Sequence, residues 1–164
     1  MNVINIAVIE SSDGQIAHKL HAHLVRCKVS FPFTIVDKIN LHTVANDIAL
    51  CIVASDEVIN QQHVLLSKEI HCKILLAPGT ASADALSQIH AKWVVGYGLS
   101  GKDTITLSSL HTHRAVLAIQ REFVTLQETV VEQQEIPINI PAKHHADDIM
   151  ALYGALLILD VIFA

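Results

Sequence analysis

The segment Ser11-Ser12-Asp13-Gly14-Gln15-Ile16 lies between an apolar run over residues 3–9 and a helical spacing of Ile16, Leu20 and Leu24. A strand, a tight turn that contains glycine and a helix, in that order, are typical of a loop that binds phosphate at the amino end of the helix. The opening of the chain therefore predicts an α/β fold that is built on this unit.

The last two residues of the segment differ from those of a working phosphate loop. Such a loop ends in Lys, whose ammonium neutralises the β- and γ-phosphates, and in Ser or Thr, whose hydroxyl ligates Mg²⁺. Gln15 and Ile16 stand at these two positions. A neutral amide and an aliphatic side chain replace neither the charge nor the metal ligand, so the sequence predicts a nucleotide-enzyme fold without the enzyme.

Composition limits the class of protein. The chain has 164 residues, of which 51% are hydrophobic and 4% are aromatic. Such an aliphatic chain of this length predicts a single α/β domain over residues 1–164. The formal net charge of -5 offers no basic surface to a phosphate backbone, so we expect no nucleic-acid partner.

Cysteine usage and the chain termini favour a cytoplasmic protein. Cys51 and Cys72 lie in apolar runs and Cys27 lies far from both, which favours buried free thiols over a disulfide scaffold or a zinc site. The amino terminus lacks the pattern of a secretion signal. The apolar run over residues 149–164 is shorter than the roughly 20 residues of a membrane span, so we expect no membrane partner.

The first hundred residues alternate between two periodicities. Short apolar runs bounded by turn residues predict strands, and apolar positions at helical spacing predict helices. The predicted strands cover residues 3–9, 34–39, 48–54, 73–76 and 93–97, and the predicted helices cover residues 15–27, 56–68 and 82–91. This alternation favours a mainly parallel sheet flanked by helices on both faces.

The pattern changes after Gly98. Residues 104–108, 115–126 and 129–140 are strand-like and have no helices between them, which predicts an added antiparallel segment with Pro137 at an edge or a bulge. A C-terminal helix follows, from residue 143 to about residue 163. Because this helix is apolar nearly all round, we expect a second copy of the chain or another protein to cover it.

Four segments resemble, in the same order, motifs of the central ATP-binding domain of the Mur ligases, which add amino acids to the peptidoglycan precursor. Residues 11–16 correspond to the family's Gly-Thr-Asn-Gly-Lys-Thr loop, and residues 47–52 to an Asp-led apolar run that ends in a Mg²⁺-binding Glu. Residues 93–99 resemble a strand that ends in Thr-Tyr-Gly, and residues 141–151 resemble the helix opening Gly-Lys-His-Asn-x-x-Asn-Ala-x-Ala. The resemblance spans essentially the whole chain.

Departures from the family pattern fall on the residues that carry its chemistry. Gln15, Ile16 and Ile52 replace the Lys, the Thr and the metal-binding Glu on which phosphoryl transfer depends. His145 and Asp148 stand at the two Asn positions that help to hold the nucleotide. The resemblance therefore implies a non-catalytic, Mur-ligase-like domain without a cofactor, which acts by binding or assembly and is linked to bacterial cell-wall metabolism.

Two other functions stay open. A binding protein or an enzyme could use the same loop at the sheet edge for a small anionic or nucleotide ligand, because backbone N–H groups at a helix start bind anions without lysine. The chain could also be a homodimeric structural module. The candidate ligand-binding residues are Ser12, Asp13, Gly14, Gln15, His144 and Asp148.

The structural alternative for the loop is an ordinary helix cap made by Ser12 or Asp13, and this is the interpretation we favour. Glu10, just before the loop, is expected to repel phosphate. The 11 histidines show no spacing of a zinc site, so no metal-binding or catalytic residue is predicted.

Overall fold

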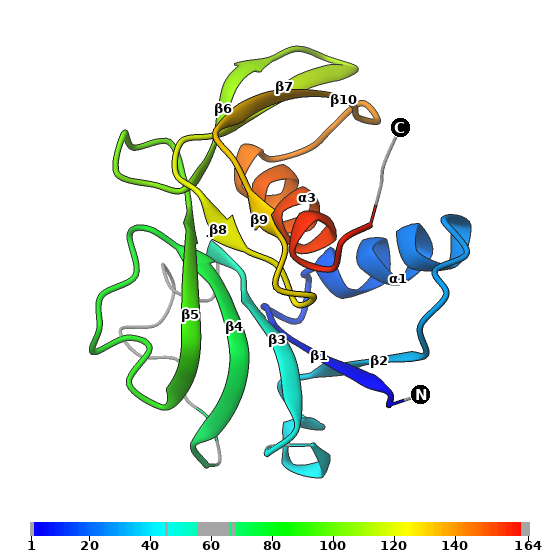
Figure 1. Cartoon of the computed structure of the whole chain (residues 1–164), viewed down its shortest axis with the longest axis vertical. Helices are drawn as coiled ribbons and strands as arrows, with labels where there is room; N and C mark the ends of the chain where they lie inside the picture. The colour runs from blue at the N-terminus through cyan, green and yellow to red at the C-terminus, as the bar shows by residue number, and fades with distance from the viewer. Residues whose placement is uncertain (1, 45, 56–65, 67, 162–164) are drawn as a thin grey trace.

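The computed structural model describes residues 2–44, 46–55, 66 and 68–161, and its centre is an eight-stranded mixed sheet (Figure 1). The strand order is β10-β7-β6-β5-β4-β3-β1-β2, with parallel pairs from β2 to β6 and antiparallel pairs at β7 and β10. A separate antiparallel pair, β8–β9, follows β7 in the chain. The fold class is therefore the predicted one: α/β, with a mainly parallel sheet, an added antiparallel segment and a C-terminal helix.

The strands are β1 (Ile4–Ile9), β2 (Phe33–Asp37), β3 (Ile48–Val53), β4 (Ile70–Pro78), β5 (Ile89–Tyr97), β6 (Ile105–Leu110), β7 (Arg114–Ile119), β8 (Phe123–Val124), β9 (Val130–Val131) and β10 (Gln134–Asn139). The helical elements are α1 (Ile16–Arg26), η1 (Leu41–Thr43) and α3 (Ala146–Ile158). All five predicted strands of the first hundred residues are confirmed, as is the first helix. The predicted helix over residues 56–68 lies almost entirely outside the described residues.

The predicted helix over residues 82–91 is wrong. Residues 83–88 form turns, and β5 begins at Ile89, where it pairs with Ile70 of β4. The backbone N–H of Ile70 donates to the carbonyl of Gln88, so sheet pairing has already started at the end of the predicted helix. Pairing along the whole of β4 outweighs the weak helical preference of this short segment.

The antiparallel segment after β6 has shorter and more numerous strands than predicted. Each of the two long predicted strands is divided in two, because the polar residues 120–122 separate β7 from β8 and residues 132–133 separate β9 from β10. Pro137 lies in β10, the edge strand, as expected for a residue that cannot donate a ladder hydrogen bond.

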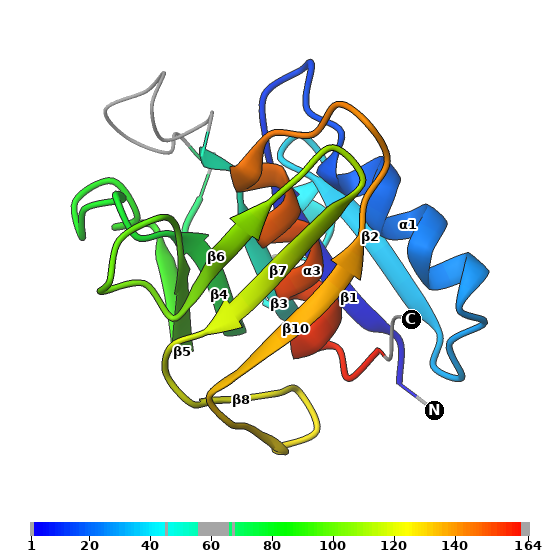
Figure 2. The same cartoon turned by 90° about the horizontal axis from the view of Figure 1, so that it is seen from above.

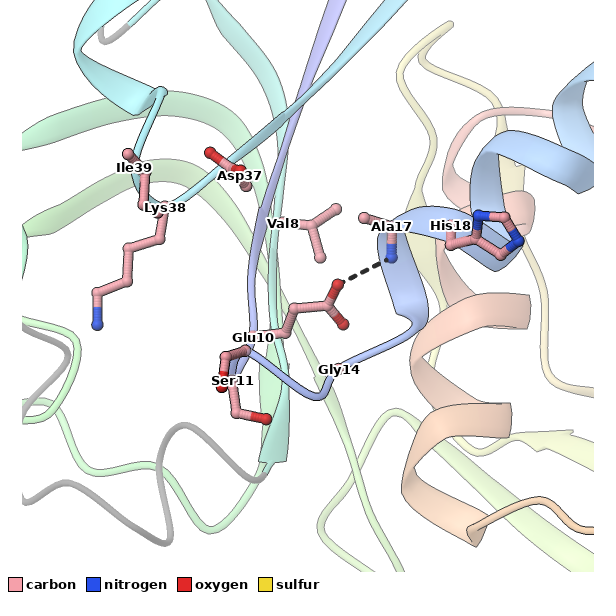
Figure 3. A pocket seen from close by; sticks show the side chains of 10 residues that line it. Val8, Glu10, Ser11, Gly14, Ala17, His18, Asp37, Lys38 and Ile39 are labelled. Atoms are coloured by element: carbon pink, nitrogen blue, oxygen red, sulfur yellow. Dashed lines mark hydrogen bonds between the residues drawn. The ribbon is translucent and has the colours of Figure 1, made fainter.

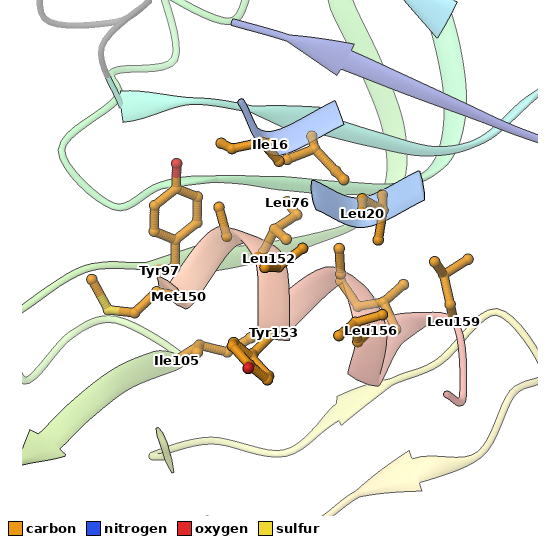
Figure 4. Close-up of a cluster of buried hydrophobic side chains, with 14 of the residues drawn as sticks. Ile16, Leu20, Leu76, Tyr97, Ile105, Met150, Leu152, Tyr153, Leu156 and Leu159 are labelled. Carbon is orange, nitrogen blue, oxygen red and sulfur yellow. The ribbon is translucent and has the colours of Figure 1, made fainter. Parts of the chain in front are cut away.

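Helix α3 lies between the parallel sheet and the β6–β7–β10 segment, with α1 beside it (Figures 1 and 2). Leu20 of α1, Leu76 of β4 and Ile105 of β6 pack into the same cluster as its side chains (Figure 4). The hydroxyl of Tyr153 donates to the carbonyl of Asn139, 3.0 Å away, which ties α3 to β10. The buried residues of α3 are Ile149, Met150, Ala151, Leu152, Tyr153, Gly154, Ala155, Leu156 and Ile158.

This burial explains why the helix is apolar on all sides. The covering comes from the same chain, so the reason given above for a partner over this helix no longer holds, and a homo-oligomer or another protein partner stays a prediction. The helix also ends earlier than predicted, because Asp160 adopts a left-handed conformation (φ 56°) and the N–H of Val161 closes back on the carbonyl of Leu156.

Helices α1 and α3 lie on the same face of the sheet. Because the predicted helix over residues 56–68 lies almost entirely outside the described residues, helices on both faces stay a prediction. The core of the other face contains Cys51 and Cys72, both buried as expected, and packs against side chains of η1 and of the turns before β5. Within the described part of the chain, no helix has the length and apolar character needed to cross a bilayer.

If α3 is the centre of the core, Leu156→Ala should lower the free energy of unfolding by about 2–5 kcal/mol, as truncation of a fully buried leucine does. Leu157→Ala is the matched control, since Leu157 is the adjacent residue and only half-buried. Urea denaturation followed by circular dichroism measures both. Equal losses in the two variants would contradict the described orientation of α3.

Candidate functional site

The carboxyl ends of β1 and β3 form the point where the strand order reverses, since the chain proceeds from β1 to β2 on one side and to β3 on the other. In open α/β sheets, ligands bind in the crevice at such a point. Three cavities of about 780, 610 and 560 Å³ follow one another along this edge. The first two share Glu10, Ser11 and Gly14, and the last two share Ser55 and Asp147, so together they form one groove, here called the edge groove.

Most of the candidate ligand-binding residues lie in the edge groove. Asp13, Gly14, Gln15 and Asp148 line its middle cavity, between the end of β1 and the start of α3. Ser12 lines the neighbouring cavity beside β2. His144 lines none of the three cavities, but its Nδ1 lies 3.4 Å from Nζ of Lys19, which lines the middle one.

The carboxylate of Glu10 occupies the amino end of α1 (Figure 3). Its Oε2 accepts the backbone N–H of Ile16 at 2.8 Å, and its Oε1 accepts that of Ala17 at 3.3 Å. These are the N–H groups that a phosphate would take at a helix start. A Cβ on Gly14 would lie 2.5 Å from Oε2, so glycine leaves the space that this carboxylate fills.

The predicted cap by Ser12 or Asp13 is therefore wrong. The residue at the cap position is Gln15, which makes no side-chain cap hydrogen bond, and Glu10 reaches the helix start from the end of β1 instead. From the sequence, Glu10 was expected only to repel phosphate. A carboxylate on the last residue before a glycine turn was the available signal, but the spacing of six residues is outside the usual capping pattern.

Ile16 and Ile52 occupy core positions. Ile16 is 3% exposed and Ile52 is fully buried, both in the cluster that surrounds α3. The two places that would hold the Mg²⁺-binding hydroxyl and carboxylate in the family motif therefore contribute to packing here.

The amino end of α3 forms the opposite wall of the middle cavity. The Ser55 hydroxyl, just after β3, donates to Oδ2 of Asp147 at 2.7 Å, which connects the switch point to α3. Before the helix, Lys143 adopts a left-handed backbone (φ 70°) that brings its side chain to the cavity wall. Neither Ser55 nor Asp147 was among the candidate residues predicted from the sequence.

Ionisable residues in the edge groove leave it acidic. Among the described residues that line it, carboxylates outnumber lysines by six to four, which disfavours a multiply charged phosphate in the groove. The carboxylates are Glu10, Asp13, Asp37, Asp103, Asp147 and Asp148, and the lysines are Lys19, Lys38, Lys102 and Lys143.

Two histidines lie between α1 and α3, His144 just before α3 and His23 near the end of α1. Burial, reinforced by Arg26, lowers the pKa of His23, whose Nδ1 lies 2.8 Å from the Arg26 guanidinium and whose ring packs edge-on against Tyr153. Burial, with Lys19 and His145 acting in the same direction and Asp148 opposing, lowers the pKa of His144. Both histidines therefore favour the neutral form in the folded protein.

Replacing Glu10 by Ala should destabilise the fold by about 1–2 kcal/mol, because the first N–H groups of α1 lose a charged acceptor. Ser12→Ala and Asp13→Ala are the controls and should each change stability by less than about 0.5 kcal/mol, as exposed substitutions usually do. Urea denaturation at pH 7 measures all three. A larger loss of stability in Asp13→Ala than in Glu10→Ala would show that Asp13, and not Glu10, caps α1.

The lowered pKa values of His23 and His144 predict a loss of stability in mild acid. As pH falls below the ordinary value of about 6.5, the unfolded chain binds protons that the folded protein excludes until pH reaches the lowered folded-state pKa values. The contribution that neutral His23 and His144 make to stability is therefore complete above about pH 6.5 and is lost as pH falls toward the lowered pKa values. Urea midpoints at pH 7.5 and 5.5 should fall less in the His23→Gln/His144→Gln variant than in the unmodified protein; parallel falls would contradict the assignment.

Comparison of the chain with protein-family models, with curated proteins and with solved structures finds no match. The Mur ligase relationship that the motifs suggest therefore stays a resemblance. The chemistry of the edge groove follows from its own residues.

Proposed function

We propose that this chain is a non-catalytic domain, similar in organisation to the Mur ligase central domain, that acts by binding or assembly. The resemblance links it to bacterial cell-wall metabolism. A homo-oligomer or a complex with another protein belongs to the proposal. The net charge of -5 argues against nucleic acid as the partner.

The single observation that carries the proposal is the position of the Glu10 carboxylate. It accepts the N–H groups of Ile16 and Ala17 that a nucleotide phosphate would need, so a phosphate must displace an anion that is attached to the chain itself. Gln15 offers no charge to favour that exchange. The absence of the lysine and the presence of an internal anion both disfavour nucleotide binding and phosphoryl transfer.

The alternative function, a small-ligand binding protein, is favoured by the edge groove itself. Its middle cavity of about 610 Å³ has the size of a small-molecule site and lies at the switch point of the sheet. Side chains that follow β1 and β3 and that precede α3 converge there. The acidic balance of the groove disfavours the anionic ligand considered from the sequence.

Calorimetric titration with Mg-ATP tests the proposal directly. We expect no binding tighter than about 100 μM, which corresponds to roughly 5 to 6 kcal/mol, and no ATP hydrolysis, because the charge and the metal ligands are missing. Tighter binding by the unmodified protein would refute the non-catalytic reading.

Two variants separate the causes. Gln15→Lys restores the charge but leaves Glu10 in place, so it should also fail to bind Mg-ATP. The double variant Glu10→Gln/Gln15→Lys removes the internal anion and should bind more tightly than either single variant. Ile16 is left unchanged in both, since it is a core residue. Full binding by Gln15→Lys alone would show that Glu10 does not close the loop.

A further inference from the structure

The cavity at the carboxyl ends of β4 and β5, about 560 Å³ in volume, contains a buried carboxylate that none of the roles above uses. Asp103 is only 6% exposed, and it lines this cavity. Its Oδ2 accepts the backbone N–H of Ser100 at 2.9 Å. Among the described residues, no group donates a hydrogen bond to its Oδ1.

Glycines on two strand ends make room for this carboxylate. A Cβ on Gly79, just after β4, would overlap Oδ1 of Asp103. A Cβ on Gly98, just after β5, would lie 2.5 Å from Oδ2. The carboxylate therefore fits closely between two glycines, with Oδ2 bonded to the backbone and Oδ1 without a donor among the described residues.

The other polar groups of this cavity are a carboxylate, several hydroxyls and one ammonium. Asp147 lines it, and one of its oxygens already accepts the Ser55 hydroxyl. The Tyr97 hydroxyl donates to the carbonyl of Val53 at 2.8 Å, so its proton is committed to the protein. Among the described residues that line it, Lys102 is the one cationic side chain, against two carboxylates. A ligand with N–H donors and a positive charge would complement the two carboxylates of this cavity.

We propose that the cavity between the ends of β4 and β5 binds the primary ammonium group of a small molecule, with Oδ1 of Asp103 and the carboxylate of Asp147 as acceptors. An ammonium carries three donors and one charge, which matches two separated carboxylates better than a planar guanidinium or a phosphate does. Leu99 and Pro78 supply apolar surface for the carbon chain beside the ammonium. This inference names a ligand class for the binding role proposed above and rests on that role.

Titration of the full chain with 1,4-diaminobutane, followed by calorimetry and by NMR of the backbone amides, tests the proposal. We expect saturable binding in the millimolar range or tighter, with the largest amide shifts at Gly79, Gly98 and Ser100. Sodium chloride at equal ionic strength controls for screening, and tetramethylammonium chloride supplies the charge without N–H donors. Both salts should fail to reproduce the shifts.

Asp103→Asn should weaken diamine binding at least tenfold, because the amide retains an oxygen for Ser100 but loses the charge. Asp84→Asn is the matched control, since Asp84 is an exposed aspartate that lines none of the three cavities. It should bind as the unmodified protein does. If Asp103→Asn does not fold, Asp147→Asn takes its place with the same expectation.

Absence of diamine binding, equal binding by Asp103→Asn, or equal shifts with tetramethylammonium would each overturn the ammonium site. None of these results would alter the proposed non-catalytic function, which depends on the Mg-ATP titration. Conversely, tight Mg-ATP binding would refute that function while the diamine titration still reported on Asp103.

Discussion

An α-helix that is apolar nearly all round has to be covered on every side, and the arrangement of the other elements follows from this constraint on α3. The parallel sheet covers one side, the β6–β7–β10 segment covers another, and α1 packs beside them. The segment after β8 closes the carboxyl end, where the N–H of Leu126 donates to the carbonyl of Ile158. Because one chain provides the whole covering, the amino end of α3 comes to lie at the carboxyl edge of the sheet, where it forms a wall of the edge groove.

At the start of α1, an internal carboxylate does for the helix what a bound phosphate does in a working nucleotide loop. Both satisfy the first free N–H groups and both place negative charge at the positive end of the helix dipole. Glu10 supplies this stabilisation permanently. The start of α1 therefore needs no bound ligand to satisfy its first N–H groups.

The predictable part of the protein is the part with local signals. Buried strands such as β1 and β3 are short apolar runs that neighbouring turns delimit, and α1 has one apolar stripe, so periodicity identifies them. The segment over residues 82–91 has an equally plausible helical spacing, yet its end joins β4 as a strand. Long-range pairing with β4 determines that the segment ends in a strand, and no residue within the segment indicates this.

For the candidate site, the sequence by itself determined which side chains stand at the positions that resemble the family motifs: Gln15 carries no charge and Ile52 offers no metal ligand. It also determined that the loop would lie at the carboxyl edge of a parallel sheet, because strand direction and right-handed crossovers leave few alternatives. Only the tertiary structure decided what occupies the loop and what faces the groove. Glu10 reaches Ile16, Ser55 reaches Asp147 across 92 residues, and Asp103 enters the space beside Gly79, because side-chain contacts between distant segments depend on how the layers pack and leave no periodic trace in the sequence.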